Sequence, residues 1–195
     1  EPLLEIDRIQ QLVEMMVAFA IFSVIMVVAV GSLLSLIKAN YKSQTTKTVV
    51  NNLHFALENM SRNIRTGTGY HCGLAGDVTT ARDCTANAES ALVFKARDGG
   101  YVMYQLLGGG IARSRSTSAQ TLVSQANFIP ITAPEVVVDT LSFYVDGADR
   151  ANEPGNGNKE QPRVFILVKG SMLGKSKVPT RFDIQTLVSQ RLLDI

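Results

Sequence analysis

Two cysteines, with a histidine and an aspartate beside them, are the residues of this chain best suited to metal binding or redox chemistry. Cys72 and Cys84 are separated by eleven residues, and His71 and Asp83 are their direct neighbours. Structural zinc sites generally contain a close Cys-x-x-Cys pair, which this sequence lacks. In an exported domain the two cysteines would form a disulfide, which closes a loop and contributes roughly 3 kcal/mol. We favour this disulfide over a metal site and over two free thiols.

Common enzyme motifs are missing from the sequence. It contains no Gly-x-Ser-x-Gly elbow, no P-loop, no His-Glu-x-x-His and no Gly-x-Gly-x-x-Gly between a predicted strand and helix. The other histidine, His54, falls on a predicted helix, where packing or exposure to solvent accounts for it. We therefore expect a protein that is not an enzyme and needs no cofactor.

Two groups of polar residues offer a choice between ligand binding and simple exposure. The segment from Asp146 to Gln161 is rich in side-chain oxygens that could hold calcium, but it lacks EF-hand spacing, so we favour a solvated loop. Six cations could gather into a patch that touches DNA, and we favour scattered turn residues instead. These cations are Arg113, Arg115, Lys169, Lys175, Lys177 and Arg181. The net charge of +2 gives no general reason to expect nucleic acid as a partner.

A long apolar stretch occupies the N-terminal region. No charged residue occurs over the 23 positions from Met15 to Ile37, and no proline interrupts them. A helix of about 20 apolar residues crosses the hydrocarbon core of a bilayer. Core helices of soluble proteins are rarely apolar on every face for this length. We therefore predict a membrane-embedded helix over residues 12–37.

One carboxylate, Glu14, stands at the start of this apolar stretch. An ionised group inside the apolar layer is costly without a partner, so Glu14 either reaches the interface or pairs with a cation. Because the chain has a single apolar stretch, a partner within the membrane would come from another copy or another protein. This indicates assembly rather than catalysis.

Beyond the apolar stretch the helical pattern continues and becomes amphipathic. Apolar residues recur every three or four positions and predict one apolar stripe. The stripe residues are Val49, Leu53, Leu57, Met60 and Ile64. We predict one continuous helix to about Arg65, ended by Gly67 and Gly69, whose second half packs on a sheet.

The rest of the chain is typical of β structure. Asp98-Gly99-Gly100 is a turn between two strands, which makes this pair a hairpin. The predicted strands are 91–96, 101–106, 111–116, 136–145, 163–169 and 180–191, whereas 117–134 and the segment around the cysteines are mostly loop. The fold class is therefore α+β, with a long N-terminal helix packed on an antiparallel sheet. Its order is an N-terminal extension (1–11), an apolar helix (12–37), an amphipathic continuation (38–66) and a β-rich domain (67–195).

The segment from Leu12 to Phe22 resembles the N-terminal helix of type IV pilins and type II secretion pseudopilins. In that family the mature chain begins with an apolar helix that carries a glutamate at its fifth position, and the helix continues onto an antiparallel sheet. Three later segments resemble the minor pilins of the PilW class and the J-type pseudopilins. They are Asp139–Val145, Gln161–Val168 and Phe182–Arg191. The resemblance implies a pilin fold.

The resemblance also implies assembly roles for two residues. Glu14 matches the glutamate that pairs with the N-terminal amine of a neighbouring subunit, and in a low dielectric such a pair sets the register of the filament. Gly31 falls where many pilins have a helix-breaking proline. Glycine breaks a helix less strongly, and it also allows close packing of helices.

The implied function is that of a structural subunit, most simply a minor one, of a type IV pilus or a type II secretion pseudopilus. Its partners would be other pilin or pseudopilin subunits, the pilus assembly machinery and, before assembly, the lipid of the bacterial inner membrane. The C-terminal domain would lie outside the cytoplasm, although the lysines after the apolar stretch favour the opposite topology. The alternative is a membrane-anchored periplasmic or extracellular binding domain that does not polymerise.

The chain departs from the family where the prepilin peptidase cuts. The family has a glycine followed by a phenylalanine, whereas alignment on Glu14 places Ile9 and Gln10 at these positions. Whether the N-terminal extension is removed is therefore left open. A second register would use Glu5 as the fifth residue, but it would place Asp7 and other polar residues inside the lipid segment.

Overall fold

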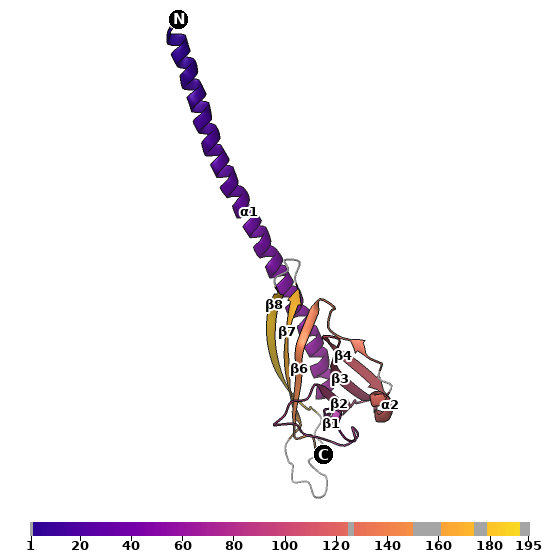
Figure 1. The fold of residues 1–195 in the computed structure, drawn as a ribbon. Helices are drawn as coiled ribbons and strands as arrows, with labels where there is room; N and C mark the ends of the chain where they lie inside the picture. Colours follow the sequence, from indigo (N-terminus) through magenta and orange to yellow (C-terminus); the bar gives the residue numbers. More distant parts are fainter. Residues whose placement is uncertain (1, 125–126, 150–160, 174–178, 192–195) are drawn as a thin grey trace. The chain divides into compact units, whose positions relative to one another are not determined.

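The computed structural model describes residues 2–124, 127–149, 161–173 and 179–191 (Figure 1). One long helix, α1 (Pro2–Arg65), precedes a β-rich region that also contains the short helix α2 (Ala119–Ser124). The α+β class predicted from the sequence is confirmed, and α1 ends where the glycines predicted. The chain divides into two compact units, Glu1–Gln44 and Thr45–Ile195, which are described separately.

The second unit contains two antiparallel sheets in place of the one that was predicted. The five-stranded sheet has the order β1-β2-β3-β4-β5, and the three-stranded sheet has the order β6-β7-β8. The first sheet consists of β1 (Thr68–Cys72), β2 (Ala91–Lys95), β3 (Tyr101–Leu107), β4 (Gly110–Ser116) and β5 (Ile129–Pro130). The second consists of β6 (Val136–Asp146), β7 (Arg163–Leu173) and β8 (Pro179–Ser189). All six predicted strands are present, and β7 extends further than predicted.

Two predicted loops contain regular structure. The segment before the first cysteine forms β1, and Gly69 within it has φ of +61°, which coincides with an irregular register between Thr68 and His71. This strand was not predicted, because glycines lie on both sides of Thr68 and glycine is rare in strand interiors. In the segment 117–134, α2 and β5 are too short to give a period that a sequence pattern reveals.

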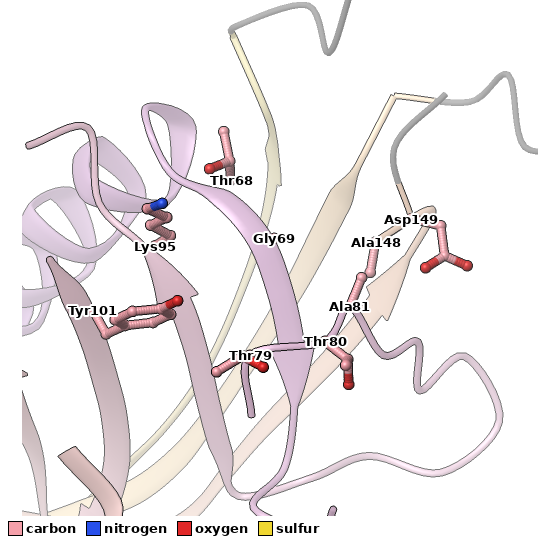
Figure 2. Close-up of a pocket in the computed structure, with 9 residues that line it drawn as sticks. All are labelled: Thr68, Gly69, Thr79, Thr80, Ala81, Lys95, Tyr101, Ala148 and Asp149. Carbon is pink, nitrogen blue, oxygen red and sulfur yellow. The ribbon is translucent and has the colours of Figure 1, made fainter. Parts of the chain in front are cut away.

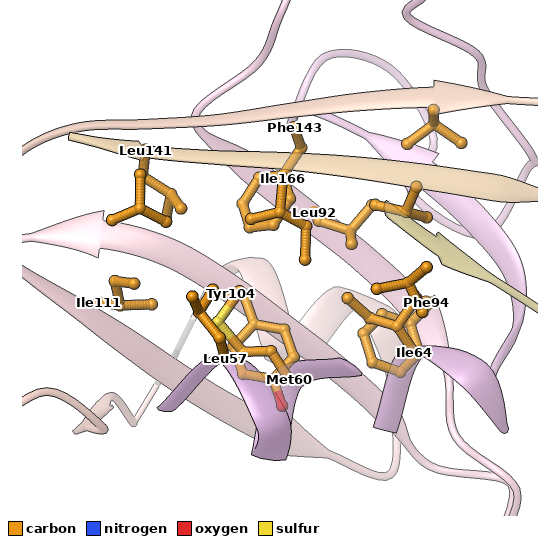
Figure 3. Packing of buried hydrophobic residues seen from close by; sticks show 14 of the residues in the cluster. Leu57, Met60, Ile64, Leu92, Phe94, Tyr104, Ile111, Leu141, Phe143 and Ile166 are labelled. Carbon is orange, nitrogen blue, oxygen red and sulfur yellow. The ribbon is translucent and has the colours of Figure 1, made fainter. Parts of the chain in front are cut away.

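The second half of α1 buries the predicted apolar stripe. Leu53, Leu57, Met60 and Ile64 are all buried, which is the i, i+4, i+7 spacing of a single helix face. Figure 3 shows the last three of these side chains directed toward side chains from the strands. The fifth stripe position, Val49, lies outside the residues whose side chains the structure describes.

The core of the second unit lies where this helix face and the two sheets meet (Figure 3). The five-stranded sheet contributes Phe94 and Tyr104, whose ring centroids lie 6.0 Å apart, and the three-stranded sheet contributes Phe143 and Ile166. All four side chains are fully buried. Each buried side chain of this size contributes roughly 1.5–3 kcal/mol, so this cluster accounts for much of the stability of the domain.

Backbone hydrogen bonds join β6 to segments that flank the strands of the five-stranded sheet. Glu89 and Phe143 exchange both of their backbone hydrogen bonds, at 3.1 and 2.8 Å, and the Cys84 N–H donates to the Val145 carbonyl at 3.0 Å. The Val138 N–H donates to the Gly109 carbonyl at 2.7 Å. These contacts cover the edge of β6 that faces away from β7, so that edge is partly closed to strand pairing.

The C-terminal end of α1 is satisfied by bonds from three parts of the chain. The Gly67 N–H donates to the Ile64 carbonyl at 3.0 Å, and the hydroxyl of Tyr70 donates to the same carbonyl at 2.6 Å. The Arg191 N–H, directly after β8, donates to the Arg65 carbonyl at 2.8 Å. The last carbonyls of a helix lack partners within the helix, so these bonds fix where α1 ends.

Candidate functional site

The first candidate is the apolar segment of α1. Every side chain from Leu12 to Ile37 is exposed, including Phe22 at 57% and Ile25 at 59%. By length and composition this one helix is able to cross a membrane, and its most apolar window has no buried residue. An apolar surface that surrounds a whole helix is unfavourable in water, so this segment requires lipid or other apolar helices around it.

The two predicted assembly residues lie on this exposed segment. Among the described residues Glu14 forms no hydrogen bond or ion pair, and its side chain is exposed. At Gly31 the helix continues without a break, and an added Cβ would meet no atom within 4 Å. The structure of the single chain therefore leaves both residues available for contacts with another molecule.

Cys72 and Cys84 are joined by a disulfide, with their Cα atoms 5.9 Å apart. Both sulfurs are thereby withdrawn from the alternative metal site, and the described residues contain no other group of histidine, cysteine or acidic side chains able to hold an ion. Asp83, the fourth residue of that alternative, instead accepts a bond from the Ala148 N–H at 2.8 Å. This part of the chain is therefore a structural staple rather than a metal centre.

His71 lies in β1, directly before the loop that the disulfide closes, and is buried. Its Nδ1 lies 2.8 Å from the Thr80 carbonyl oxygen, and its Nε2 lies 3.0 Å from the Ala75 carbonyl oxygen. Each ring nitrogen faces a carbonyl oxygen, and a nitrogen that carries a proton donates it to that oxygen. Through these contacts His71 ties β1 to both ends of the segment 75–80.

The segment 75–80 is fixed further by Asp77. The Thr79 N–H and hydroxyl both donate to the Asp77 carboxylate, at 2.9 and 2.7 Å, and the Thr80 hydroxyl donates to the Asp77 carbonyl at 2.7 Å. The two bonds from Thr79 lower the pKa of Asp77, burial opposes them slightly, and the nearby His71 lowers the pKa further. The segment is therefore a well-ordered wall beside β1.

A polar depression, which we call the Gly69 hollow, lies over β1 beside this wall (Figure 2). Its volume is about 390 Å³, within the roughly 300–1,000 Å³ of small-molecule sites. It is lined by Thr68, Gly69, Thr79, Thr80, Ala81, Lys95, Tyr101, Ala148 and Asp149. Thr68, Lys95 and Tyr101 are neighbours across the sheet, because Lys95 pairs with Thr68 of β1 on one side and with Tyr101 of β3 on the other.

The remaining predicted polar groups do not form a site within the part of the chain that the structure describes. Asp146 pairs with Arg163 at 2.8 Å. Of the predicted cations, Arg115 pairs with Asp98 and Lys169 pairs with Asp183. The segment 150–160 of the oxygen-rich loop, together with Lys175 and Lys177, lies outside the described residues.

His54 is exposed, which agrees with one of the two predictions made for it, packing or exposure to solvent. It lies in a groove of about 530 Å³ between the second half of α1 and β8, together with Glu58 and Ile184. No acid–base partner for its ring nitrogens is found among the described residues. The histidine is therefore a surface residue of the helix.

Sequence reasoning did not identify the residues of the Gly69 hollow. They come from five separate segments, and no two of the charged ones are close in sequence. The single local signal is Gly69, a glycine within a strand, which often marks a close approach or an open space. Scans against protein-family models and searches of curated proteins and of solved structures find no match for this chain.

Proposed function

We propose that this chain is a structural subunit, a minor pilin or pseudopilin, of a type IV pilus or type II secretion pseudopilus. One observation carries the proposal: the segment Leu12–Ile37 exposes apolar side chains on every face of a helix that continues unbroken into the amphipathic half bearing the folded domain. Lipid covers such a surface before assembly, and other apolar helices cover it in a filament. The role is structural rather than catalytic.

Assembly follows from the chemistry of the apolar segment. The segment stores the subunit in the bacterial inner membrane, with the disulfide-bonded domain in an oxidising compartment outside the cytoplasm. In the filament the helices pack side by side through their small residues, which are Ala18, Ala20, Ser23, Ala29, Gly31, Ser32 and Ser35. Glu14 pairs with the N-terminal amine of a neighbouring subunit and sets the register between them.

The decisive experiment compares Glu14→Ala with Glu58→Ala in cells that produce the native assembly machinery. Both glutamates are exposed on α1, but only Glu14 lies in the apolar segment. We expect Glu14→Ala to reduce the amount of subunit in sheared filaments by tenfold or more, because an unpaired amine would be left in an apolar layer. Glu58→Ala should leave incorporation unchanged. Equal incorporation of both variants would refute the pairing role.

Mass spectrometry of the intact subunit tests the same proposal at the N-terminus. A mature chain that begins at Gln10 would place Glu14 fifth and would support assembly through a new amine. A chain that begins at or before Glu1 would favour the alternative, a binding domain that stays anchored in the membrane and does not polymerise. The Gly69 hollow is the observation that favours this alternative.

A cysteine introduced into the apolar segment separates the two proposals directly. Ser23 is exposed among the small residues, and its hydroxyl donates to the Phe19 carbonyl of the same helix. In a filament Ser23→Cys should form intersubunit crosslinks, whereas in a solitary anchor it should stay a monomer. Ser118→Cys, which is exposed in the second unit, is the matched control for random collision.

A further inference from the structure

We propose that the Gly69 hollow binds a neutral pyranose unit of a saccharide. The proposal holds whether or not the chain assembles, because all lining residues belong to the unit Thr45–Ile195.

At Gly69 no side chain covers the backbone of β1 that lines the hollow. A Cβ added at Gly69 would meet no atom within 4 Å, so the backbone of β1 forms an open floor between the walls. Figure 2 shows Lys95 and Tyr101 on one side of β1, and Ala148 and Asp149 on the other. A ligand that lies across Gly69 would therefore contact a cation at one end and a carboxylate at the other.

The lining is polar and electrically balanced, which narrows the class of ligand. Its apolar part consists of the methyl groups of the alanines and threonines, the methylene groups of Lys95 and the ring of Tyr101. An apolar ligand would leave the hydroxyls and charges without partners, which is costly. The carboxylate of Asp149 disfavours an inorganic anion, and the ammonium of Lys95 disfavours a divalent cation.

Sugar hydroxyls suit both ends of the hollow. Each hydroxyl both donates and accepts, so it donates to Asp149 and accepts from Lys95. The aromatic ring of Tyr101 offers an apolar surface for the C–H groups of a pyranose, and its hydroxyl supplies one further polar contact. Among the described residues, the side chains of Thr68, Lys95, Tyr101 and Asp149 have no hydrogen bond or ion pair to satisfy them.

The wall of the hollow formed by Thr79 and Thr80 is held in place before any ligand binds. Thr79 and Thr80 donate their hydroxyl protons to Asp77, which leaves their oxygens as acceptors of fixed position. His71 contacts the Thr80 carbonyl and so anchors the same segment to β1, and the disulfide fixes Cys84, four residues further on, to the same strand. Such preorganisation reduces the entropy that a weakly binding ligand would otherwise lose.

An NMR titration of the isotope-labelled full chain in detergent micelles tests the proposal. The probes are glucose, galactose, mannose and N-acetylglucosamine, with inorganic phosphate and L-serine as rival ligands. We expect at least one sugar to shift the backbone amide signals of Gly69 and Ala81 in a saturable manner. The absence of such shifts with all four sugars would overturn the proposal, and so would saturable shifts with phosphate or serine only.

Two pairs of variants locate the binding. Asp149→Asn should weaken binding of that sugar by about tenfold or more, since a hydrogen bond to a charged group is lost. Asp139→Asn, an exposed aspartate on β6 away from the hollow, should leave binding unchanged.

Tyr101→Phe should weaken binding severalfold, whereas Tyr144→Phe should have no effect. Unchanged affinity in both Asp149→Asn and Tyr101→Phe would overturn the proposal. Asp149→Asn should still enter filaments normally, which separates this result from the assembly experiment.

Discussion

The two halves of α1 share one secondary structure and differ in the environment of their side chains. From Leu12 to Ile37 all faces are apolar and all side chains are exposed, whereas in the second half one apolar stripe is buried and the other faces are mainly polar, with Val50 and Phe55 as exposed apolar exceptions. Met26 is 48% exposed and Met60 is fully buried. Hydrophobicity alone therefore does not say where a helix packs: the narrow stripe forms part of the core, whereas the broad apolar surface takes no part in it.

Substitution of the two methionines should separate the halves most clearly. Met60→Ala removes a side chain that packs against the sheets, so we expect the free energy of unfolding of the domain to fall by about 2–5 kcal/mol. Met26→Ala should leave that free energy unchanged. Urea unfolding of the full chain in detergent, followed by near-ultraviolet circular dichroism, measures both. Equal losses of unfolding free energy in the two variants would show that the two halves of α1 contribute equally to the stability of the domain.

Removal of the disulfide should destabilise only the second unit. Replacing Cys72 and Cys84 by serine together opens a loop with a sequence separation of 12, and we expect a loss of roughly 3 kcal/mol. The helicity of the apolar segment should not change, because no residue of the disulfide loop belongs to it. Reduction of the wild-type protein serves as an independent control and should give the same loss.

Tyr104 anchors the polar margin of the second half of α1, and Tyr104→Phe should cost about 1 kcal/mol at neutral pH. The variant loses the bond that the Asn63 amide donates to the Tyr104 hydroxyl at 2.8 Å. Burial raises the pKa of Tyr104 above its usual value of about 10, against the weaker effects of Asn63 and Arg113.

The raised pKa gives this prediction a pH dependence. Since the folded state holds the phenolic proton more tightly, this contribution is complete below about pH 10 and is lost as the pH rises above it. Urea midpoints should therefore fall more steeply above pH 10 for the wild type than for Tyr104→Phe. Tyr41→Phe, an exposed tyrosine outside the second unit, should follow the wild type at every pH. Parallel curves for all three proteins would contradict the assignment.

The smallest effect is expected at Gly31. Replacement by alanine favours the helix by up to about 1 kcal/mol, and the new Cβ meets no atom of the described chain. The unfolding free energy of the domain should stay the same, while helicity measured by far-ultraviolet circular dichroism should rise slightly or not at all. If glycine serves close packing between subunits, Gly31→Ala should lower filament incorporation without any change in the monomer.

The regular elements were predictable where they are long. The stripe from Leu53 to Ile64 has the helical period over three turns, and the later strands have continuous β-branched and aromatic runs. β1 was missed because Gly67 and Gly69 interrupt its pattern, and α2 because six residues do not establish a period. The division into two sheets was not predictable, because it depends on which strands pair.

The candidate sites also differ in how far they could be predicted from the sequence. The cysteine pair was identified from its short separation along the chain, Glu14 from its place at the start of the apolar stretch, and Gly31 from the resemblance to pilins. The Gly69 hollow was not predicted from the sequence. Lys95 and Asp149 come to line one hollow only in the folded chain, where β1 lies between the strand that carries Lys95 and the segment that follows β6. The two carbonyl contacts of His71 likewise depend on a turn whose geometry is set by Asp77.

The bond that the Arg191 N–H donates to the Arg65 carbonyl joins the end of α1 to a residue made much later during synthesis. The end of α1 leaves the ribosome early, but the donor that completes it follows the last strand of the second sheet. Since β8 is also the last partner that β7 receives, the domain finishes folding only after almost the whole chain has been made. A truncation before β8 should therefore yield a protein whose β-rich domain is unfolded.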